Sequence, residues 1–314
     1  VSRSNLAGAA QIAIFMLLIV TFIIYIERLS RQRRRYSNTQ RLHPIQPQKL
    51  HGKAALIALI LGWIPVIIGF VFPALYLLIE TFVRLEQVGS ISSGLLKSTL
   101  NTLSLAACAT LFTVLIGLLI AWVIRNPHFR HGKVMVRLGS LGYAIPGSVL
   151  AIGLLTPFNL LDDGISKLMA MITGAPPQLY IMGSMAGLVI AYCIRFLAIT
   201  IGSFESAYAR IPISLDNASR SLGQTEEQTF RKIHLPLLRP ALGAAALLVF
   251  VDAMKELSAT LLLRPLSFET LATWLYAEAA RGTYEEGAIA ALLIVIVGLL
   301  PVILLARTQT NKEY

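Results

Sequence analysis

Charged residues are scarce in this chain. Asp, Glu, Lys and Arg make up 14% of its 314 residues, whereas a typical soluble domain has about 25%. Hydrophobic residues make up 56% and the mean hydropathy is +0.70, which excludes a disordered chain because disordered chains are poor in apolar residues. The composition therefore argues against a water-soluble enzyme.

Cysteines and enzyme motifs are also scarce. Cys108 and Cys193 lie in apolar runs without a CxxC or Cys/His cluster, so neither a disulfide framework nor a zinc site is indicated. The sequence has no GxxxxGK[S/T] phosphate loop and no HExxH motif. Ser148 lacks a GxSxG frame, and the adjacent Asp162–Asp163 are predicted to form a solvated turn before Gly164. We expect no enzymatic activity, and no cofactor or metal bound by this chain itself.

Long apolar runs are abundant. A helix needs about 20 apolar residues to cross a hydrocarbon core. Seven runs meet this requirement: Leu6–Ile26, Ala54–Ile79, Leu100–Ile124, Val134–Phe158, Tyr180–Gly202, Ala241–Leu263 and Ala288–Ala306. They predict an all-α integral membrane protein with one isolated helix followed by a six-helix unit.

The net charge of +11 is explained by the distribution of the basic residues. Most of the 27 Lys and Arg residues lie in one alternating set of loops: Glu27–Lys53, Arg125–Arg137, Ser203–Pro240 and the tail from Arg307. Cytoplasmic loops carry such an excess, so these segments and the C-terminus are predicted to be cytoplasmic. The charge therefore indicates topology and not a nucleic-acid partner.

The first run is too long for a secretory signal peptide and lacks a small-residue cleavage site.

A polar, arginine-rich segment, Arg28–Lys53, follows the first apolar run. Two interpretations remain open: a site for nucleic acid or anionic lipid, or a cytoplasmic stop-transfer segment and spacer. The chain is accordingly divided into residues 1–53 (first helix and linker), 54–306 (six-helix unit) and 307–314 (cytoplasmic tail).

The loop between the fifth and sixth runs has the pattern of two short helices. Ser214 is predicted to cap the first helix, with Asp216 in its first turn, and Gly223 to end it. Thr225 and Gln228 form a capping-box pattern for the second helix. A narrow face of small and apolar side chains is formed by Leu215, Ala218, Ser219 and Leu222. From this pattern alone, a docking element and an ordinary ordered loop are equally good interpretations.

This loop resembles the EAA loop of permease subunits of binding-protein-dependent ABC importers. The family pattern is Glu-Ala-Ala, three residues, Gly, nine residues, then Ile-x-Leu-Pro. Residues 214–236 match it at Ala218, Gly223, Ile233, Leu235 and Pro236. Asn217 replaces the family's Glu and Ser219 its second Ala, while Asp216 and Leu222 flank the motif. The resemblance implies a variant coupling loop that an ATPase grips, with a weaker contact at Asn217 as an open possibility.

Two further stretches narrow the resemblance. Residues 250–265 and 143–150 are similar to segments of ferric-iron (Fbp- and Sfu-type) permeases. The resemblance is strongest over residues 94–304 and implies a type I ABC importer transmembrane domain in the bacterial inner membrane. Residues 1–45 resemble the last helix and linker of a preceding permease half, as expected for the C-terminal half of a fused permease.

The resemblance also implies partners. These are a cytoplasmic ATP-binding subunit dimer that uses ATP and Mg²⁺, a periplasmic solute-binding protein, a second permease half (fused or separate) and the lipid bilayer. Ferric iron is the expected solute, although thiamine, phosphonate, sulfate and polyamine permeases share the same loop.

Ionisable residues occur within two of the predicted spans. Asp252, Lys255 and Glu256 are spaced so that Asp252 reaches both of the others along one helix face. Arg195 in the preceding span is a possible partner for the uncompensated carboxylate. Such groups are costly in a bilayer and face a pathway or one another. A translocation gate and a structural ion pair therefore both remain open, and no iron site is expected.

Two other classes of function remain possible. One is a membrane scaffold that does not transport. The other is an ATP-independent carrier that uses Asp252, Lys255 and Glu256 as a proton relay, against which the EAA-like loop argues.

Overall fold

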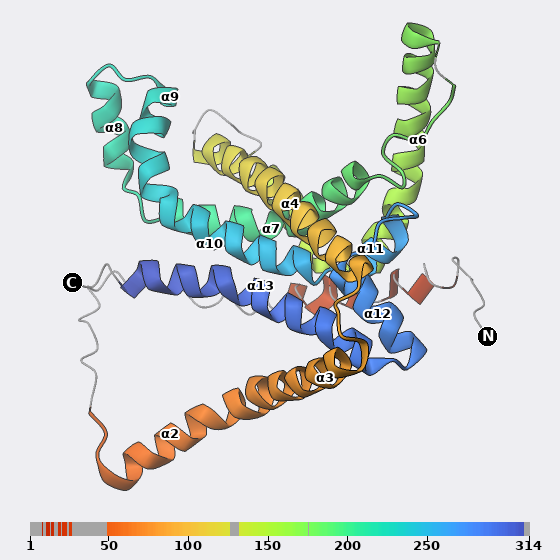
Figure 1. Ribbon diagram of the computed structural model, residues 1–314. Helices are drawn as coiled ribbons and strands as arrows, with labels where there is room; N and C mark the ends of the chain where they lie inside the picture. The colour runs from red at the N-terminus through yellow and green to blue at the C-terminus, as the bar shows by residue number, and fades with distance from the viewer. Residues whose placement is uncertain are drawn as a thin grey trace.

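The computed structural model describes residues 49–125, 132–174 and 176–310, with scattered residues between positions 8 and 26. Within these residues every regular element is a helix (Figure 1). The first half comprises α2 (Gly52–Val66), η1 (Ile67–Val71), α3 (Phe72–Val88), α4 (Ser93–Arg125), α5 (Gly132–Ala144) and α6 (Gly147–Thr173). The second half comprises α7 (Met185–Tyr208), α8 (Ile213–Ser221), α9 (Glu226–Thr229), η2 (Phe230–His234), α10 (Leu235–Met254), α11 (Ser258–Leu263), α12 (Leu271–Arg281) and α13 (Tyr284–Thr310).

Five helical segments in the described residues are long and apolar enough to cross a membrane. They are Gly52–Gln87, Ser93–Arg125, Gly147–Thr173, Met185–Tyr208 and Glu226–Met254. The predicted runs Ala54–Ile79 and Leu100–Ile124 are confirmed as parts of single helical segments, and Ala288–Ala306 lies within α13. Most of the run Leu6–Ile26, the arginine-rich linker up to residue 48 and the last four residues lie outside the described residues.

The predicted fourth span, Val134–Phe158, is wrong as a single helix. It is divided between α5 and α6, with Ile145 and Pro146 between them. Proline has no backbone N–H and clashes with the preceding turn, so it ends α5. Helix α6 then continues to Thr173, well beyond Phe158, where the predicted span ended.

The solvated turn predicted at Asp162–Asp163 is also wrong. Asp162 lies within α6 and is only 1% exposed. Its carboxylate accepts backbone hydrogen bonds from Tyr180, Ile181 and Met182 at 2.7–2.8 Å. These three N–H groups take the place of water around the carboxylate, so Asp162 holds the segment before α7 against α6.

The predicted sixth span, Ala241–Leu263, has different bounds. The helical segment begins before it and ends at Met254, and α11 starts separately at Ser258. The intervening residues include Lys255 and Glu256, so two of the charged residues lie at a helix break and not inside a continuous helix.

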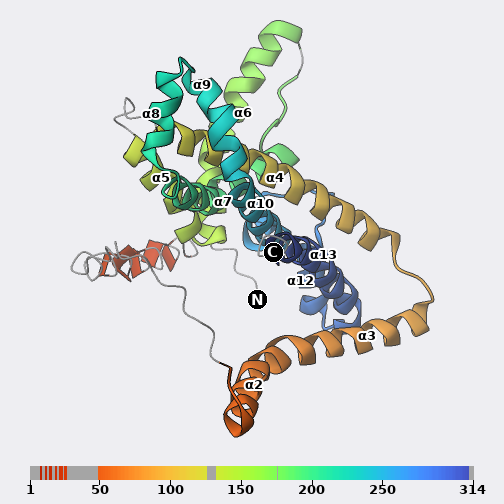
Figure 2. The same ribbon diagram turned by 90° about the vertical axis from the view of Figure 1, so that its left-hand side faces the viewer.

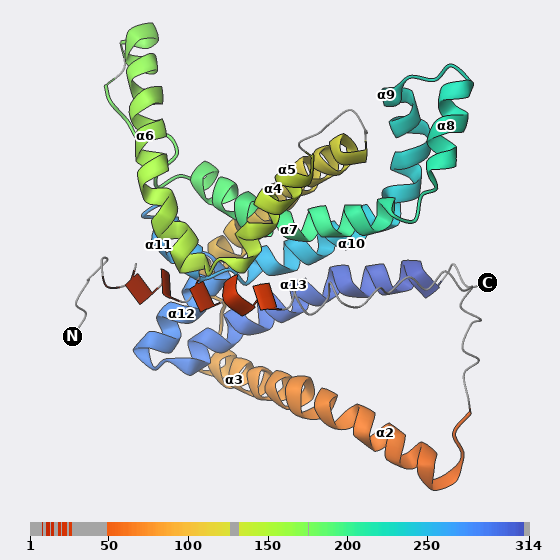
Figure 3. The same cartoon turned by 180° about the vertical axis from the view of Figure 1, so that it is seen from behind.

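The core of the fold is formed by α4, α7 and α10. Small residues at their contacts are fully buried, including Ala109 on α4, Ala191 on α7 and Ala245 on α10. Figure 2 shows α13 between α10 and α3, and α2 has no buried residue. The pair α8 and α9 lies at one end of α7 and α10, whereas α6 extends away from the other helices (Figures 1 and 3).

This packing predicts opposite effects for two glycine substitutions. In Gly142→Ala on α5, the new Cβ would overlap the backbone carbonyl oxygen of Ile194 on α7. Because backbone cannot move aside cheaply, we expect a loss of about 1–3 kcal/mol in the free energy of unfolding. Gly202 on α7 has no heavy atom within 4 Å of its added Cβ, so Gly202→Ala should be neutral or stabilising by up to about 1 kcal/mol.

Thermal unfolding in detergent, followed by circular dichroism, measures both variants against the wild type. Equal unfolding midpoints for Gly142→Ala and Gly202→Ala would contradict the close α5–α7 contact.

Candidate functional site

The turn between α8 and α9 has the geometry expected of a helix end with glycine. Gly223 has a φ of +75°, a conformation that costs glycine little. The Gly223 N–H donates to the Arg220 carbonyl at 2.9 Å and the Gln224 N–H to the Ser219 carbonyl at 3.1 Å, as in a Schellman motif. The prediction that Gly223 ends the first helix is confirmed.

Of the two helix N-terminal caps predicted for this loop, one is confirmed and one is wrong. The capping box is confirmed: the Gln228 N–H donates to the Thr225 hydroxyl at 3.2 Å, and the Thr225 N–H donates to the Gln228 side chain at 2.9 Å. The prediction that Ser214 caps α8 is wrong, because α8 begins at Ile213 and its N-cap is Pro212, two residues before Ser214. Ser214 therefore lies inside the first turn.

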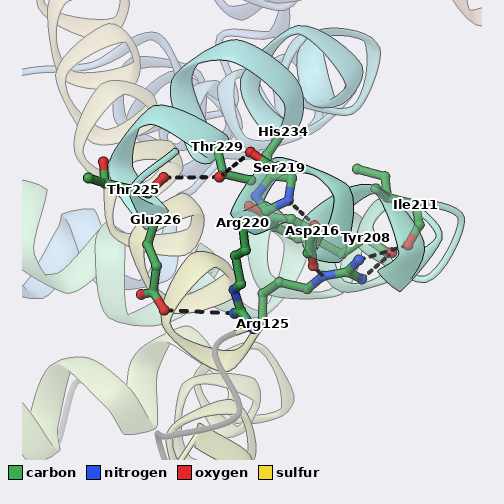
Figure 4. A network of polar contacts seen from close by, with 10 residues as sticks. All are labelled: Arg125, Tyr208, Ile211, Asp216, Ser219, Arg220, Thr225, Glu226, Thr229 and His234. Carbon is green, nitrogen blue, oxygen red and sulfur yellow. Dashed lines mark hydrogen bonds and ion pairs between the residues drawn. The ribbon is translucent and has the colours of Figure 1, made fainter. Parts of the chain in front are cut away.

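A buried polar network joins this loop to the end of α4 (Figure 4). The Arg125 guanidinium donates from Nε to Asp216 Oδ2 at 2.9 Å. It also donates to the backbone carbonyls of Tyr208 at 3.1 Å and Ile211 at 2.9 Å. One side chain from α4 thus binds both the carboxylate of α8 and the chain end of α7, where carbonyls lack helical partners.

His234 completes this network from the other side. Its Nε2 lies 2.8 Å from Asp216 Oδ1, and the residue is 4% exposed. The imidazole packs edge-on against the rings of Tyr208 and Phe230, at centroid distances of 5.3 and 6.4 Å. The two carboxylate oxygens of Asp216 are therefore held by residues from two different elements.

The electrostatics of Asp216 follow from these contacts. Burial by itself would raise the pKa of the carboxyl group, but the hydrogen bonds from His234 and Arg125 lower it further than burial raises it. The pKa of Asp216 is therefore held below its ordinary value, and the group is a carboxylate at neutral pH.

The predicted small-residue face of α8 is divided in the structure. Ser219 is buried and its hydroxyl lies 2.7 Å from that of Thr229. Asp216 is also buried, whereas Asn217, Ala218 and the following turn are exposed. The exposed residues include Leu222, at 78%, and Gly223. Of the C-terminal part of the motif, Ile233 and Leu235 are half-buried and Pro236 is exposed.

The charges of the predicted membrane pathway form two separate pairs. Arg195 Nε lies 3.0 Å from Glu256 Oε2, so the predicted pairing of Arg195 with a carboxylate is confirmed. Asp252 pairs instead with Lys255 at 2.8 Å. The prediction that Asp252 reaches both residues is wrong, because α10 ends at Met254 and Glu256 turns toward α7.

The Arg195–Glu256 pair lies where two helix interruptions meet. Arg195 Nη1 donates to the Ile145 carbonyl between α5 and α6 at 3.2 Å. Glu256 accepts from the Ala259 N–H at 3.1 Å, at the start of α11. A Cβ on Gly147 would lie 2.6 Å from Glu256 and 2.7 Å from Arg195, so only glycine fits there without displacement. The pair therefore hydrogen-bonds to one backbone group at each helix break: the Ile145 carbonyl between α5 and α6, and the Ala259 N–H at the start of α11.

The second pair is more open. The Lys255 side chain is 63% exposed and that of Asp252 is 18% exposed. The Tyr143 hydroxyl donates to Asp252 at 3.4 Å. In the part of the chain that the structure describes, no group of three or more His, Cys, Asp or Glu side chains could hold a metal ion.

Several residues of both clusters escaped sequence reasoning. The sequence placed Arg125 at the start of a basic loop and His234 at the unspecified position of the Ile-x-Leu-Pro motif, and it indicated no contact for either. Nothing in the linear sequence connects Gly147 to Arg195.

The buried pair predicts a non-additive response. Arg195→Leu leaves the Glu256 carboxylate buried without its cation, so we expect the free energy of unfolding to fall by about 3–5 kcal/mol. The double variant Arg195→Leu/Glu256→Leu removes both charges and should lose less than Arg195→Leu alone. Unfolding in detergent measures the wild type, Arg195→Leu, Glu256→Leu and the double variant. A double variant that loses the sum of both single losses would contradict the pairing.

Comparison with known proteins agrees with this geometry. Residues 113–312 match the family described as "Binding-protein-dependent transport system inner membrane component". A putative ferric transport system permease protein, FbpB 1, of Haemophilus influenzae is 34% identical over 173 residues, covering 55% of this chain and 25% of that protein. The putative 2-aminoethylphosphonate permease PhnV of Salmonella typhimurium is 26% identical over 220 residues, covering 70% of this chain and 77% of that protein.

The chain spans about a quarter of the length of two of the ferric permeases that it matches, and 41% of a third, FbpB 2 of Haemophilus influenzae. Among solved structures, a chain of a bacterial ABC transporter for alginate import has a TM-score of 0.61 at 17% identity, with 82% of this chain and 94% of that chain covered. A chain of the MetNI methionine ABC transporter has a TM-score of 0.52 at 19% identity, with 69% and 97% covered. The fold is thus that of ABC importer transmembrane subunits, and the chain belongs to the family of inner-membrane components of binding-protein-dependent transport systems.

Proposed function

We propose that this chain is the permease of an ATP-driven importer and forms part of its translocation pathway. The observation that carries the proposal is the α8–α9 loop. It is built from buried polar contacts on its inner side and leaves Asn217, Ala218 and Leu222 exposed on its outer side. An ordered helix with small and apolar exposed side chains fits a partner that approaches closely.

The partner of this face is a cytoplasmic ATP-binding subunit dimer. ATP and Mg²⁺ belong to that dimer, and this chain holds no cofactor. A periplasmic solute-binding protein delivers the solute, and a second permease half, fused or separate, completes the pathway. The family membership supports these assignments. So does a solved structure with a similar chain, that of a bacterial alginate ABC transporter in complex with an alginate-bound periplasmic protein.

Ferric iron is the proposed solute. It is supported by the names of ferric permease relatives, one of which is 34% identical. The phosphonate permease, which aligns over more of this chain, makes 2-aminoethylphosphonate the second candidate.

Within the pathway we assign the open Asp252–Lys255 pair to the lining, because an exposed ammonium group at membrane depth requires water or a partner. The Arg195–Glu256 pair is assigned to packing.

The solute is tested with the complete importer in proteoliposomes, supplied with its binding protein and ATP. We expect uptake of ⁵⁵Fe(III) that excess unlabelled ferric iron abolishes and 2-aminoethylphosphonate does not affect. Uptake of labelled phosphonate without iron uptake would overturn the iron assignment and leave the importer class intact. Uptake driven by a pH gradient without nucleotide would favour an ATP-independent carrier.

The coupling loop and the C-terminus are placed in the cytoplasm, on the grounds of the basic loops. A cysteine at the exposed position Asn217 tests this in a protein whose two native cysteines are replaced by alanine. A membrane-impermeant maleimide should label it in inverted vesicles and not in right-side-out vesicles. The reverse pattern would contradict the orientation.

The docking face predicts a selective loss of the ATP-binding subunit. Ala218→Trp places a large ring on the exposed side of α8, so it should reduce both association with the ATP-binding subunit and uptake at least tenfold. Leu56→Trp on α2, where Leu56 is 58% exposed, is the matched control and should retain both.

Equal membrane insertion of the two variants, measured by detergent extraction and gel filtration, separates docking from folding. Wild-type association and uptake in Ala218→Trp would rule out this face as the docking site. A wild-type permease that binds no ATP-binding subunit would favour a scaffold.

A further inference from the structure

We infer that Asp216 is a positioning residue that ties α8 to α4 and α10, so that these helices move with the coupling loop. This inference rests on the proposed function and assigns the mechanical connection of the same site. Asp216 then acts inside the permease and does not touch the ATP-binding subunit.

The direction of the Asp216 side chain is the first support. The residue is 8% exposed and lies on the inner side of α8, next to the exposed Asn217 and Ala218. Because neighbouring helix residues point about 100° apart, the Asp216 side chain points away from the side on which Asn217 and Ala218 are exposed. In the described residues, α8 buries Asp216 and Ser219.

The number of elements that the carboxylate joins is the second support. Its Oδ2 accepts from Arg125, the last residue of α4, at 2.9 Å. Its Oδ1 lies 2.8 Å from His234, after which α10 begins. A force on α8 is thus applied to the ends of two helices that pack together in the core.

Arg125 adds a third element. Its guanidinium uses one nitrogen for Asp216 and the other two for the Tyr208 and Ile211 carbonyls. The end of α7 and the chain that leads into α8 are therefore held by the same group. Lysine offers one compact ammonium group in place of this planar fork, so it cannot reproduce the three directions.

Another ion pair of α8 has a longer distance between its charged groups and more exposed side chains. Arg220 and Glu226 are 3.8 Å apart, and both side chains are 48% exposed. Exposed pairs of this kind contribute little to stability because water screens them. The Ser219–Thr229 contact connects α8 to α9, not to a core helix. The Asp216 contacts are therefore the ones suited to carry motion into the core.

The test separates binding of the ATP-binding subunit from transmission of its motion to the core helices. Asp216→Asn keeps the size of the side chain and removes its charge. In the assembled importer, we expect the amount of bound ATP-binding subunit to stay within twofold of wild type, while solute transported per ATP hydrolysed falls at least tenfold. Parallel loss of capture and uptake would overturn the inference, and so would an unchanged ratio of transport to hydrolysis.

Three further variants exclude a general folding defect. Arg125→Gln/Asp216→Asn removes both charges together, so no buried cation is left unpaired, and it should show the same loss of transport per ATP. His234→Gln keeps a donor for Asp216 and should retain more coupling than His234→Leu. Equal coupling in the two His234 variants would overturn the role of this contact.

A measurement on the permease alone separates this inference from the proposed function. Backbone hydrogen exchange of α8 should be at least tenfold faster in Asp216→Asn than in wild type, and unchanged in Ala218→Trp. Unchanged exchange in Asp216→Asn would overturn the tie, whatever the importer does. A wild-type permease that captures no ATP-binding subunit would instead overturn the proposed function, and the transmission role with it.

Discussion

Because α4 and α7 carry small residues where they meet, their backbones approach closely, and this contact sets the position of everything else. A Cβ on Gly117 would overlap the Thr200 side chain, whose hydroxyl donates to the Thr113 carbonyl at 3.2 Å. Lipid tails are as apolar as leucine, so helices in a bilayer associate through such close packing and through hydrogen bonds between them. The contact brings Arg125 at the end of α4 beside the end of α7.

The contact between α4 and α7 also explains why buried charged side chains are stable at two places in the structure. Arg195 extends from α7 to the place where α5 and α10 are both interrupted, and there it meets Glu256. At the other end of the bundle, Arg125 meets Asp216 where α7 ends and α8 begins. In both places a guanidinium pairs with a carboxylate from another element and also binds carbonyls that a helix end has freed. Buried ions are stable only when their remaining hydrogen bonds are satisfied in this way.

The apolar runs, the Gly223 helix end and the Thr225–Gln228 capping box could all be predicted, because each depends on residues that are near neighbours in the chain. The boundaries were less predictable. Hydropathy does not distinguish a long helix from two shorter ones, so the α5–α6 break at Pro146 and the end of α10 were missed. Asp162 was misplaced for a related reason: an aspartate in a polar stretch looks solvated until residues 180–182 fold back to donate their N–H groups.

The sequence by itself determined that this is an all-α membrane protein, the number of its apolar runs and the location of the loop with two short helices, since composition and local spacing encode all three. Tertiary structure alone decided which side of α8 is exposed and which partners hold its charge. Asp216 lies 91 residues from Arg125 and 18 from His234 along the chain. Contacts over such separations depend on how α4, α7 and α10 pack, and no local pattern records that packing.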